Sequence, residues 1–316
     1  MALIHEFAWS ASRAAGFREC QRAHYFSYYG GWRGWERGEP EERQRLYQLN
    51  KLKRMAAVAG TAVHSQLAQY FHMRPDHTAD AKEIAERATE MLRRCYQESA
   101  EGLWKRSASK FTHLAEHHFK EDTMADRDAV AEYGRRFVER IEQCVDGFFS
   151  SEGLAWVRDA DPSLYLFVED DKSAFDTFQY EGTKIFGSPD FVIRDAHGHV
   201  HLYDWKTGSP SKNDAFQLHV YALYARIKWG VPVEEFSGYD AYLQTGEVVK
   251  CEITKESMAA AEQEIRDSIG AMRELHFDAD EGMGNREPFL MIGGEEPGAE
   301  DLRVCGRCNF REVCGR

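Results

Sequence analysis

Two short segments that carry carboxylates constrain the fold of this chain more than any other feature of its sequence. Asp190 lies in IFGSPDFVIR and Asp204 in HVHLYDWK, with thirteen residues between them. Both segments are rich in aromatic and β-branched residues, which is typical of strands, and the intervening DAHG suits a hairpin turn. Because strand side chains alternate between faces, Asp204 and Lys206 project from one side and Trp205 from the other. Such a hairpin brings Asp190 close to Asp204.

The proximity of two carboxylates and a lysine has a chemical consequence. Two carboxylates that converge on one point repel each other, and a hard cation such as Mg²⁺ or Mn²⁺ removes that cost because it prefers oxygen ligands. A metal in such a site lowers the pKa of a water and polarises a phosphoryl oxygen, while Lys206 orients the attacking water and offsets charge on the phosphate. Taken alone, a D-x-K triplet is more often a surface hairpin with solvated ion pairs, so the triplet by itself leaves both interpretations open.

The remaining pattern predicts an α/β protein with a largely helical N-terminal half. Apolar residues recur at three- and four-residue spacing from about residue 79 to 149, and a helix is expected to begin near Gly60–Thr61. After about residue 163 the segments LYLFVED, SGYDAYLQ and EVVKCEI are predicted as further strands. Helices are expected from about 214 to 229, with Asn213 or Asp214 as the cap and Gly230 as the stop, and from about 255 to 275. The tail beyond residue 277 is expected to be a loop until its cysteines.

Composition excludes some classes of protein and leaves others open. The chain has 316 residues, is 43% hydrophobic and 29% charged, and carries a formal net charge of −13, as expected of a soluble globular protein. The acidic balance argues mildly against a positive coat for sequence-independent DNA binding, although basic residues can be confined to one groove. No apolar run approaches the ~20 residues of a membrane helix, and the N-terminal residues lack the pattern of a signal peptide. A cytoplasmic location without membrane attachment is therefore expected.

The two carboxylate segments resemble motifs of the PD-(D/E)XK nuclease superfamily, in particular its RecB-like branch. That branch joins a G-x-x-D strand to a (D/E)-x-K strand followed by T-G, matched here by Gly187-Ser-Pro-Asp190 and Asp204-Trp-Lys206-Thr-Gly. The resemblance implies a restriction-endonuclease-like fold, in which helices flank a mixed central sheet, and a metal-dependent DNA nuclease with Lys206 in catalysis. It also implies that Asp190, Asp204 and the backbone carbonyl of Trp205 hold Mg²⁺ or Mn²⁺.

Three further matches follow in the order that the branch shows. Gly60-Thr-Ala-Val-His64 supplies a histidine early in a helix, which the resemblance makes a third metal ligand, although a lone histidine is more often an ordinary core or surface residue. Gln217-Leu-His-Val-Tyr221 matches the Q-x-x-x-Y helix that follows the lysine, and its i and i+4 side chains share a face. There Gln217 is expected to bind a phosphate or the surroundings of the lysine. Tyr221 contacts the nucleic-acid backbone or, alternatively, belongs to the apolar stripe of the helix. Glu169 matches an acidic residue often found one strand before G-x-x-D.

The seven cysteines are unevenly distributed. Cys305, Cys308 and Cys314 crowd the last residues in C-x2-C-x5-C spacing, and Cys20 is the candidate for the fourth ligand that a four-coordinate site needs. In a reducing compartment such clustering favours a metal over disulfides. One N-terminal and three C-terminal cysteines resemble the AddB-type and CRISPR spacer-acquisition nucleases of the branch, in which they hold a 4Fe–4S cluster. Those relatives often have proline after the first cysteine, where this chain has Gln21, and spacing alone leaves zinc as the alternative.

Aromatic residues crowd the segment that follows Cys20. They either stack on unpaired bases, as aromatic side chains do in single-strand-binding proteins, or pack around the cluster, which is expected for at least half of them. The residues concerned are Tyr25, Phe26, Tyr28, Tyr29 and Trp32.

These features together predict a single nuclease domain over residues 1–316. Residues 61–160 are its helical region, 160–275 its PD-(D/E)XK core, and 1–60 with 277–316 the segments that hold the cluster. By resemblance, the activity is exonucleolytic or end-trimming on single-stranded DNA or DNA with exposed ends, in DNA repair, CRISPR or antiviral defence, with protein partners in a DNA-processing complex. One alternative is a DNA-end-binding module with a weak or silent nuclease, against which the intact set of site residues argues. Another is an iron–sulfur electron carrier, for which the carboxylates and the lysine are superfluous.

Overall fold

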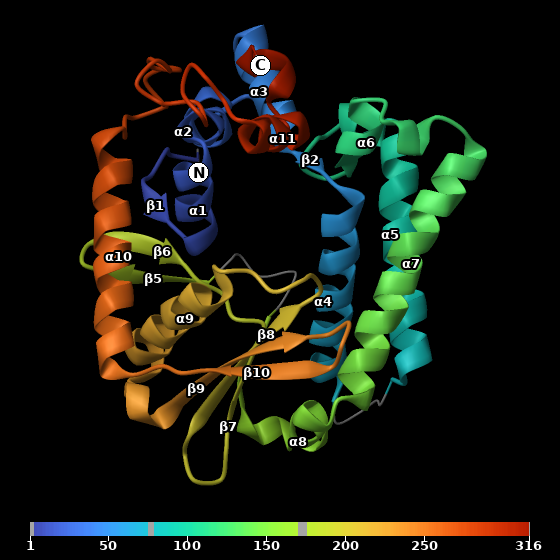
Figure 1. Ribbon diagram of the computed structural model, residues 1–316, viewed down its shortest axis with the longest axis vertical. Coiled ribbons are helices and arrows are strands. Elements are labelled where there is room, and N and C mark those ends of the chain that lie inside the picture. The colour runs from blue at the N-terminus through green and yellow to red at the C-terminus, as the bar shows by residue number, and fades with distance from the viewer. Residues whose placement is uncertain (1–2, 75–78, 170–175, 316) are drawn as a thin grey trace.

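The computed structural model describes residues 3–74, 79–169 and 176–315, and it shows a mixed α/β fold around a five-stranded sheet (Figure 1). The strand order is β10-β9-β8-β7-β4, formed by Glu247–Cys251, Phe236–Tyr242, Val200–Lys206, Phe191–Arg194 and Tyr165–Val168. Strands β8 and β9 are parallel, and the other neighbouring pairs of this sheet are antiparallel. The expected fold class, a mixed central sheet flanked by helices, is confirmed.

Helix α9 (Asp214–Trp229) connects the parallel strands β8 and β9. A crossover is needed here because parallel neighbours cannot be joined by a tight turn. The helix ends at Gly230, whose φ of +67° lies in the left-handed region that glycine adopts without strain. Its bounds agree with the sequence prediction, although the side chain of Asn213 makes no capping hydrogen bond.

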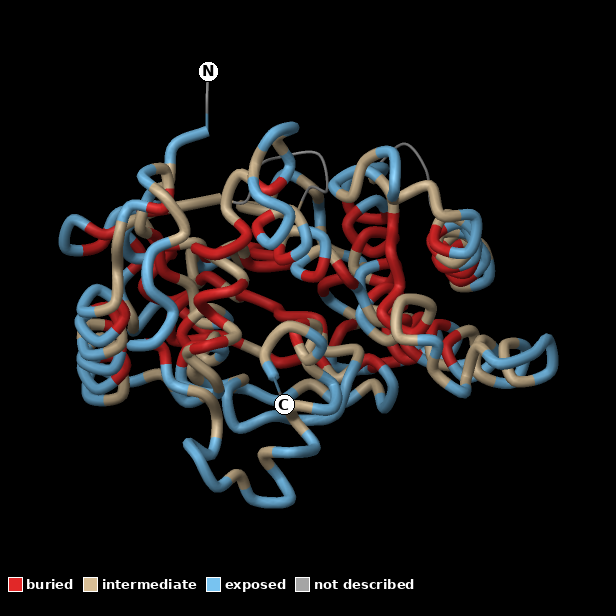
Figure 2. Tube along the Cα trace, turned by 90° about the horizontal axis from the view of Figure 1, so that it is seen from above, coloured by how far each residue is buried: buried red, intermediate tan, exposed pale blue. Residues whose placement is uncertain are grey.

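Helices cover both faces of the sheet, as Figure 1 shows. One face packs on α4 (Met55–Met73) and α7 (Arg127–Ser150), with α5 (Ala81–Ala100) against both helices, and the other face packs on α9 and α10 (Lys255–Glu274). Strand residues alternate accordingly, since Trp205 belongs to the first core and Leu202 to the second. The buried positions in Figure 2 gather along the central strands and the inward faces of these helices.

Small sheets and short helical segments complete the chain. Strands β1 (Ala8–Trp9), β6 (Thr183–Phe186) and β5 (Thr177–Tyr180) form a three-stranded sheet in the order β1-β6-β5, and β2 (Leu52–Lys53) pairs with β3 (His113–Leu114). The remaining short helical segments are Leu103–Lys105, α6 (Ala115–His118), Asp122–Met124, Glu152–Leu154, α8 (Ala155–Asp159), Pro162–Leu164 and Val233–Glu235. Among the described helices, none has the length and apolar character needed to cross a membrane.

The two ends of the chain pack against each other (Figure 1). The N-terminal part comprises α1 (Ala11–Glu19), α2 (Gln21–Tyr25), a π-helical segment (Phe26–Gly30) and α3 (Glu41–Asn50), and the C-terminal part comprises α11 (Ala299–Arg307) and α12 (Arg311–Cys314). A third core that contains Phe26, Phe289 and Phe310 joins them. The backbone N–H of Arg22 donates to the carbonyl oxygen of Leu290 at 3.0 Å. The ends are therefore held together by packing and hydrogen bonds of the chain itself.

Helix α4 begins earlier than its sequence predicts. It starts at Met55 rather than near Gly60, and the carboxylate of Glu116 accepts a hydrogen bond from the backbone N–H of Met55 at 3.0 Å. This tertiary contact satisfies a donor that the first turn of a helix leaves unpaired. Because the capping residue is 61 positions away, no local signal marks the true start.

Three other expected elements differ in the structure. IFGSPDFVIR is not one strand but two, β6 and β7, in different sheets. Pro189 in the connection has no N–H to continue a ladder. The expected helical stretch from 79 to 149 is interrupted at 101–126 by short elements, and the tail expected to be a loop until its cysteines already enters helix α11 at Ala299. Asp170, at the end of LYLFVED, lies outside the described residues.

Candidate active site

The β7–β8 hairpin brings Asp190 and Asp204 together, as expected. Phe191 is opposite Tyr203 in the antiparallel register, so the next position outward places Asp190 opposite Asp204. Asp190 accepts a hydrogen bond through Oδ2 from the backbone N–H of Trp205 at 2.6 Å. Asp190 and Asp204 are only 7% and 4% exposed, which means that two neighbouring carboxylates have been removed from water.

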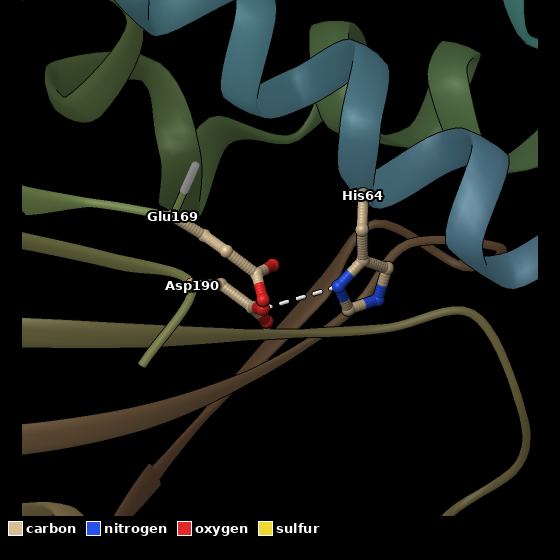
Figure 3. Close-up of side chains that lie close together, drawn as sticks. All are labelled: His64, Glu169 and Asp190. Carbon is tan, nitrogen blue, oxygen red and sulfur yellow. Dashed lines mark hydrogen bonds and ion pairs between the residues drawn. The ribbon is translucent and has the colours of Figure 1, made fainter. Parts of the chain in front are cut away.

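His64 and Glu169 converge on the same point from other elements (Figure 3). His64 lies on α4, Glu169 directly follows β4, and Asp190 directly precedes β7. The Nδ1 atom of His64 lies 3.1 Å from Oδ1 of Asp190, and one ligand atom from each of the three residues lies within 4.8 Å of the other two. In the part of the chain that the structure describes, this is the one group of three or more His, Cys, Asp or Glu residues that converges so closely. Imidazole and carboxylate donors at this spacing fit a divalent cation.

Helix α4 approaches the end of β8 closely enough to deliver His64. A Cβ atom on Gly60 would lie 2.9 Å from Oγ1 of Thr207, so only glycine allows this contact without a shift of the threonine. From the other side, the guanidinium of Arg140 on α7 donates through Nε to the carbonyl oxygen of Thr207 at 2.7 Å. Arg140 is a positioning residue that sequence analysis missed, since nothing distinguishes it from the other arginines of a long amphipathic helix.

Lys206, Gln217, Tyr221 and Asp204 form a closed hydrogen-bonded ring. The Lys206 ammonium makes an ion pair with Oδ2 of Asp204 and donates to Oε1 of Gln217 at 3.0 Å. Nε2 of Gln217 donates to the hydroxyl of Tyr221 at 2.7 Å, and that hydroxyl donates to Oδ1 of Asp204 at 3.5 Å. Gln217 therefore binds the lysine, as one of its two expected roles required. Tyr221 is buried in the second core, as expected of the apolar stripe of the helix, and its hydroxyl also belongs to the ring. Its contact with the nucleic-acid backbone stays a prediction.

Two further carboxylates surround Lys206. Oδ1 of Asp214 lies 3.4 Å and Oδ1 of Asp240 lies 3.5 Å from its Nζ atom. Asp240 is opposite Asp204 in the parallel β8–β9 register. Sequence analysis missed both residues, because an aspartate in a predicted strand or helix end gives no sign of which strand becomes its neighbour. Around this site carboxylates outnumber cationic side chains among the described residues, which creates a demand for a bound cation.

Burial and charge shift the pKa values of these groups in opposite directions. Burial, together with the charge of Asp190, raises the pKa of Asp204 to about 7 against the effect of Lys206. Burial opposes ionisation of Asp190, but the neighbouring His64 imidazolium outweighs it and lowers the pKa of Asp190. Burial likewise opposes the charged form of His64, yet Asp190 raises its pKa to about 9. Burial also raises the pKa of the Tyr221 hydroxyl, so this group remains protonated and donates a hydrogen bond.

A cleft of about 730 Å³ opens beside this group. Glu169, Gln217 and Tyr221 line the end nearest the carboxylates, and Ser10, Ser12, Arg13 and Phe216 line the rest of it, together with other residues of α1 and α9. The volume falls within the range of binding sites for small organic ligands. The cleft therefore gives a substrate access to the carboxylates and to the lysine ring.

The four cysteines expected to share a metal face one cavity of about 350 Å³. Its lining includes Cys20, Cys305, Cys308 and Cys314 together with Phe26 and other apolar residues. Burial, together with the charges of the other three thiols, raises the pKa of Cys308 to about 11. A hydrogen bond from Phe310 N–H has the opposite effect. A cation in the cavity is what would favour the thiolate forms. The structure thus brings together the residues that are 285 positions apart in the sequence.

The aromatic residues after Cys20 divide into two groups. Tyr25, Phe26 and Tyr29 are buried in the third core, and of these three Phe26 lines the cavity that the four cysteines face. Tyr28 and Trp32 are half-buried and line a separate cavity.

Comparison with known proteins gives one family. The family model of the PD-(D/E)XK nuclease superfamily matches residues 8–315, almost the whole chain. Nucleases of this superfamily are metal-dependent and act on DNA, in agreement with the convergence of His64, Glu169 and Asp190 beside Lys206. No curated protein matches the chain. From the carboxylate hairpin, the lysine that follows it and this match, the chain belongs to the PD-(D/E)XK nuclease superfamily.

Proposed function

We propose that this protein is a Mg²⁺- or Mn²⁺-dependent deoxyribonuclease whose metal is held by His64, Asp190, Asp204 and the backbone carbonyl of Trp205. The observation that carries this proposal is the convergence of His64, Glu169 and Asp190 next to the lysine ring. Glu169 joins the proposed ligand set, because its carboxylate lies within the same 4.8 Å group. Oδ2 of Asp204 is paired with Lys206, and Oδ1, which also accepts the hydrogen bond from Tyr221, is the oxygen proposed to bind the cation.

The bound metal would supply a water of lowered pKa and a polarised phosphoryl oxygen. The chain's own residues supply position and charge. Gln217 and Asp204 fix the Lys206 ammonium by direct contacts, and Tyr221 fixes Gln217 in turn. A fixed ammonium costs no reorganisation as negative charge grows on the phosphate, which is the condition for efficient electrostatic stabilisation. Lys206 is therefore proposed to act in the transition state.

The lining of the cleft supports a substrate that carries phosphate groups. The first turn of α1 presents Ser10 and Ser12 to the cleft, with Arg13 beside them. Hydroxyls, helix N-terminal N–H groups and a guanidinium all suit phosphate. The activity is proposed to be exonucleolytic or end-trimming on single-stranded DNA. By resemblance, it is proposed to serve DNA repair, CRISPR spacer acquisition or antiviral defence in the cytoplasm, with protein partners.

A cleavage assay tests this function directly. Purified protein is expected to shorten end-labelled single-stranded DNA in the presence of Mn²⁺ and to lose all activity in EDTA, because the carboxylates require a cation to act. An internally labelled duplex of the same sequence serves as the comparison for substrate preference. Binding to DNA ends without any metal-dependent cleavage would instead support the second candidate, an end-binding module with a silent nuclease.

Metal affinity is expected to increase with pH. A cation needs the neutral imidazole of His64, whereas Asp190 holds that ring protonated up to a pKa of about 9 in the metal-free protein. Metal must therefore displace a proton from His64, so the Mn²⁺ association constant should rise up to about tenfold per pH unit from pH 7, above which Asp204 is mostly ionised, to pH 9, and should then level off. Calorimetry in buffers of different ionisation enthalpy counts the released protons. His64→Asn should lower the count by one and His118→Asn should not; an equal count in wild type and His64→Asn would exclude His64 as a ligand.

We further propose that Cys20, Cys305, Cys308 and Cys314 hold a structural 4Fe–4S cluster. All four line one cavity, which is the arrangement that a shared metal requires. Four thiolates can also hold one zinc ion, and the resemblance of the cysteine spacing to the cluster-bearing nucleases of the branch is what favours iron over zinc. No electron transfer is needed for hydrolysis, so the proposed role is architectural.

A further inference from the structure

A second, smaller cavity lies next to the cleft and has aromatic walls. It has a volume of about 200 Å³. We call it the aromatic pocket, after the rings among its lining residues: His24, Tyr28, Trp32, Trp35 and Tyr47. Trp35 meets Trp32 edge to face, with ring centroids 5.1 Å apart, and meets Tyr47 at 5.6 Å. Trp35 is 39% exposed. An indole held at this exposure by two aromatic neighbours offers a surface on which a flat ring can stack.

The aromatic pocket adjoins the cleft beside the carboxylates. Arg13 and Tyr28 line both cavities. The Arg13 guanidinium lies 4.5 Å from the ring centroid of Tyr28 and 4.9 Å from that of Phe186, and it donates to the carbonyl oxygen of Ala8 at 2.9 Å. These contacts fix Arg13 at the junction. A ligand that extends from the carboxylates to the aromatic pocket must pass this guanidinium.

The charges along this path favour an anionic ligand, because Glu6, the carboxylate that lines the pocket, is paired with Lys184 at 3.0 Å. In the described part of the chain, Arg13 has no carboxylate within 4.0 Å, although Arg18 in the same cleft is paired with Glu264. Lys51 lines the far side of the pocket with its ammonium 5.3 Å from the Tyr47 ring centroid, and it too has no carboxylate within 4.0 Å among the described residues. Arg13 and Lys51 thus lack a carboxylate partner among the described residues, although acidic side chains exceed basic ones in this chain, whose net charge is −13. Both side chains can pair with phosphates, one on either side of the aromatic rings.

The lining of the pocket includes one buried polar atom that can contact a ligand, Nδ1 of His24. His24 is 6% exposed, and its Nδ1 atom has no hydrogen-bond partner among the described residues. Burial and the charge of Arg13 lower the pKa of His24 to about 4, so the ring is neutral and adds no charge against a heterocyclic base. At about 200 Å³ the cavity is smaller than the ~300–1,000 Å³ of sites for drug-sized ligands. Its size suits one planar heterocycle rather than a base pair.

We propose that the aromatic pocket binds one unpaired base of the DNA strand whose backbone lies in the cleft, and that Arg13 holds the phosphate between that base and the scissile position. The proposal rests on the proposed nuclease function and specifies its substrate, a strand that is unpaired near the cut. Stacking on aromatic side chains selects unpaired bases without reading sequence, since a base within a duplex is covered by its neighbours. Arg13 and Trp35 are positioning residues and do not touch the reacting atoms.

Equilibrium binding in EDTA separates this pocket from catalysis. A fluorescein-labelled single-stranded oligonucleotide and its duplex are titrated with wild-type protein, Arg13→Gln and Trp35→Ala. Trp156→Ala is the matched control, because Trp156 is 38% exposed on α8, and Arg135→Gln on α7 makes the same charge change elsewhere. One stacked base contributes about 1–3 kcal/mol. Trp35→Ala and Arg13→Gln are therefore each expected to weaken single-strand binding by about tenfold or more, with both controls within twofold of wild type.

The outcomes distinguish the pocket from the nuclease. If Trp35→Ala binds the single strand as tightly as wild type, or weakens single strand and duplex equally, the pocket does not hold an unpaired base. If the variants lose single-strand binding as expected but wild type never cleaves with Mn²⁺, the pocket stands and the nuclease function fails.

Discussion

Asp190→Asn is expected to reduce DNA cleavage by on the order of 1,000-fold or more at saturating Mn²⁺, because metal catalysis contributes several kcal/mol and each ~1.4 kcal/mol is a factor of ten. Asparagine keeps the size of the side chain and can still accept the Trp205 N–H bond, but it lacks the charge that attracts a cation and pairs with His64. Turnover is measured on single-stranded DNA, and calorimetry measures Mn²⁺ affinity. Both quantities should fall while the circular dichroism spectrum stays that of wild type.

The matched control for this variant is Asp195→Asn. This substitution makes the same charge change on the same hairpin, because Asp195 lies at the turn, away from the carboxylate pair. Its bonds from the backbone N–H groups of His197 and His199 can also be accepted by an amide oxygen. Asp195→Asn should cleave within about threefold of wild type. Activity of Asp190→Asn within tenfold of this control would disprove the role of Asp190 in holding the metal.

Cys20→Ser is expected to abolish the proposed cluster and to lower the melting temperature by roughly 10 °C. Cys20 is 285 positions from Cys305, and a covalent link across so long a loop stabilises the folded state by about 5 kcal/mol in the chain-entropy account, where each kcal/mol shifts a large domain by roughly 2 °C. Wild-type protein purified without oxygen should be brown and contain about four irons per chain. The variant should be colourless, as seen by absorption near ~400 nm and by iron analysis.

Cys251→Ser separates the loss of a ligand from the loss of a thiol. Cys251 is half-buried like Cys20 but lies on β10, and it does not line the cysteine cavity. This control should keep its colour, its iron and its melting temperature. A colourless wild type with one tightly bound zinc would replace iron by zinc and keep the link between the two ends. Unchanged metal content in Cys20→Ser would show that Cys20 is not a ligand.

The third core should keep the two ends of the chain partly associated in the Cys20→Ser variant. The two ends of the chain still share Phe26, Phe289 and Phe310, and the Arg22 guanidinium still donates to the carbonyl oxygen of Phe289 at 2.9 Å. Loss of the cluster should therefore loosen the ends before it unfolds the central sheet. Since α1 carries Arg13 and ends next to Cys20, DNA affinity is expected to fall together with stability.

Much of the candidate site was predictable because its information is local. Strand alternation placed Asp204 and Lys206 on one face, and the hairpin turn placed Asp190 opposite Asp204. Helical spacing placed Gln217 and Tyr221 on one face of α9, where they complete the ring. Each of these inferences spans only a few residues or one turn. The cysteine spacing likewise indicated a common site, and the four thiols do face one cavity.

What the sequence by itself determined is the set of elements and the pairing of residues that are neighbours along the chain. The family resemblance added the distant residues His64 and Cys20, and only the tertiary structure decided which other distant residues join them. Glu116 sets the start of α4, Asp240 reaches Lys206 through a parallel strand pair, and Arg140 fixes the carbonyl of Thr207. These contacts depend on how helices and strands pack after they form, and packing is governed by the shape and burial of whole surfaces rather than by periodicity. The tertiary structure likewise placed the aromatic pocket next to the cleft, because α1, α3 and the segments between them meet only in the folded chain.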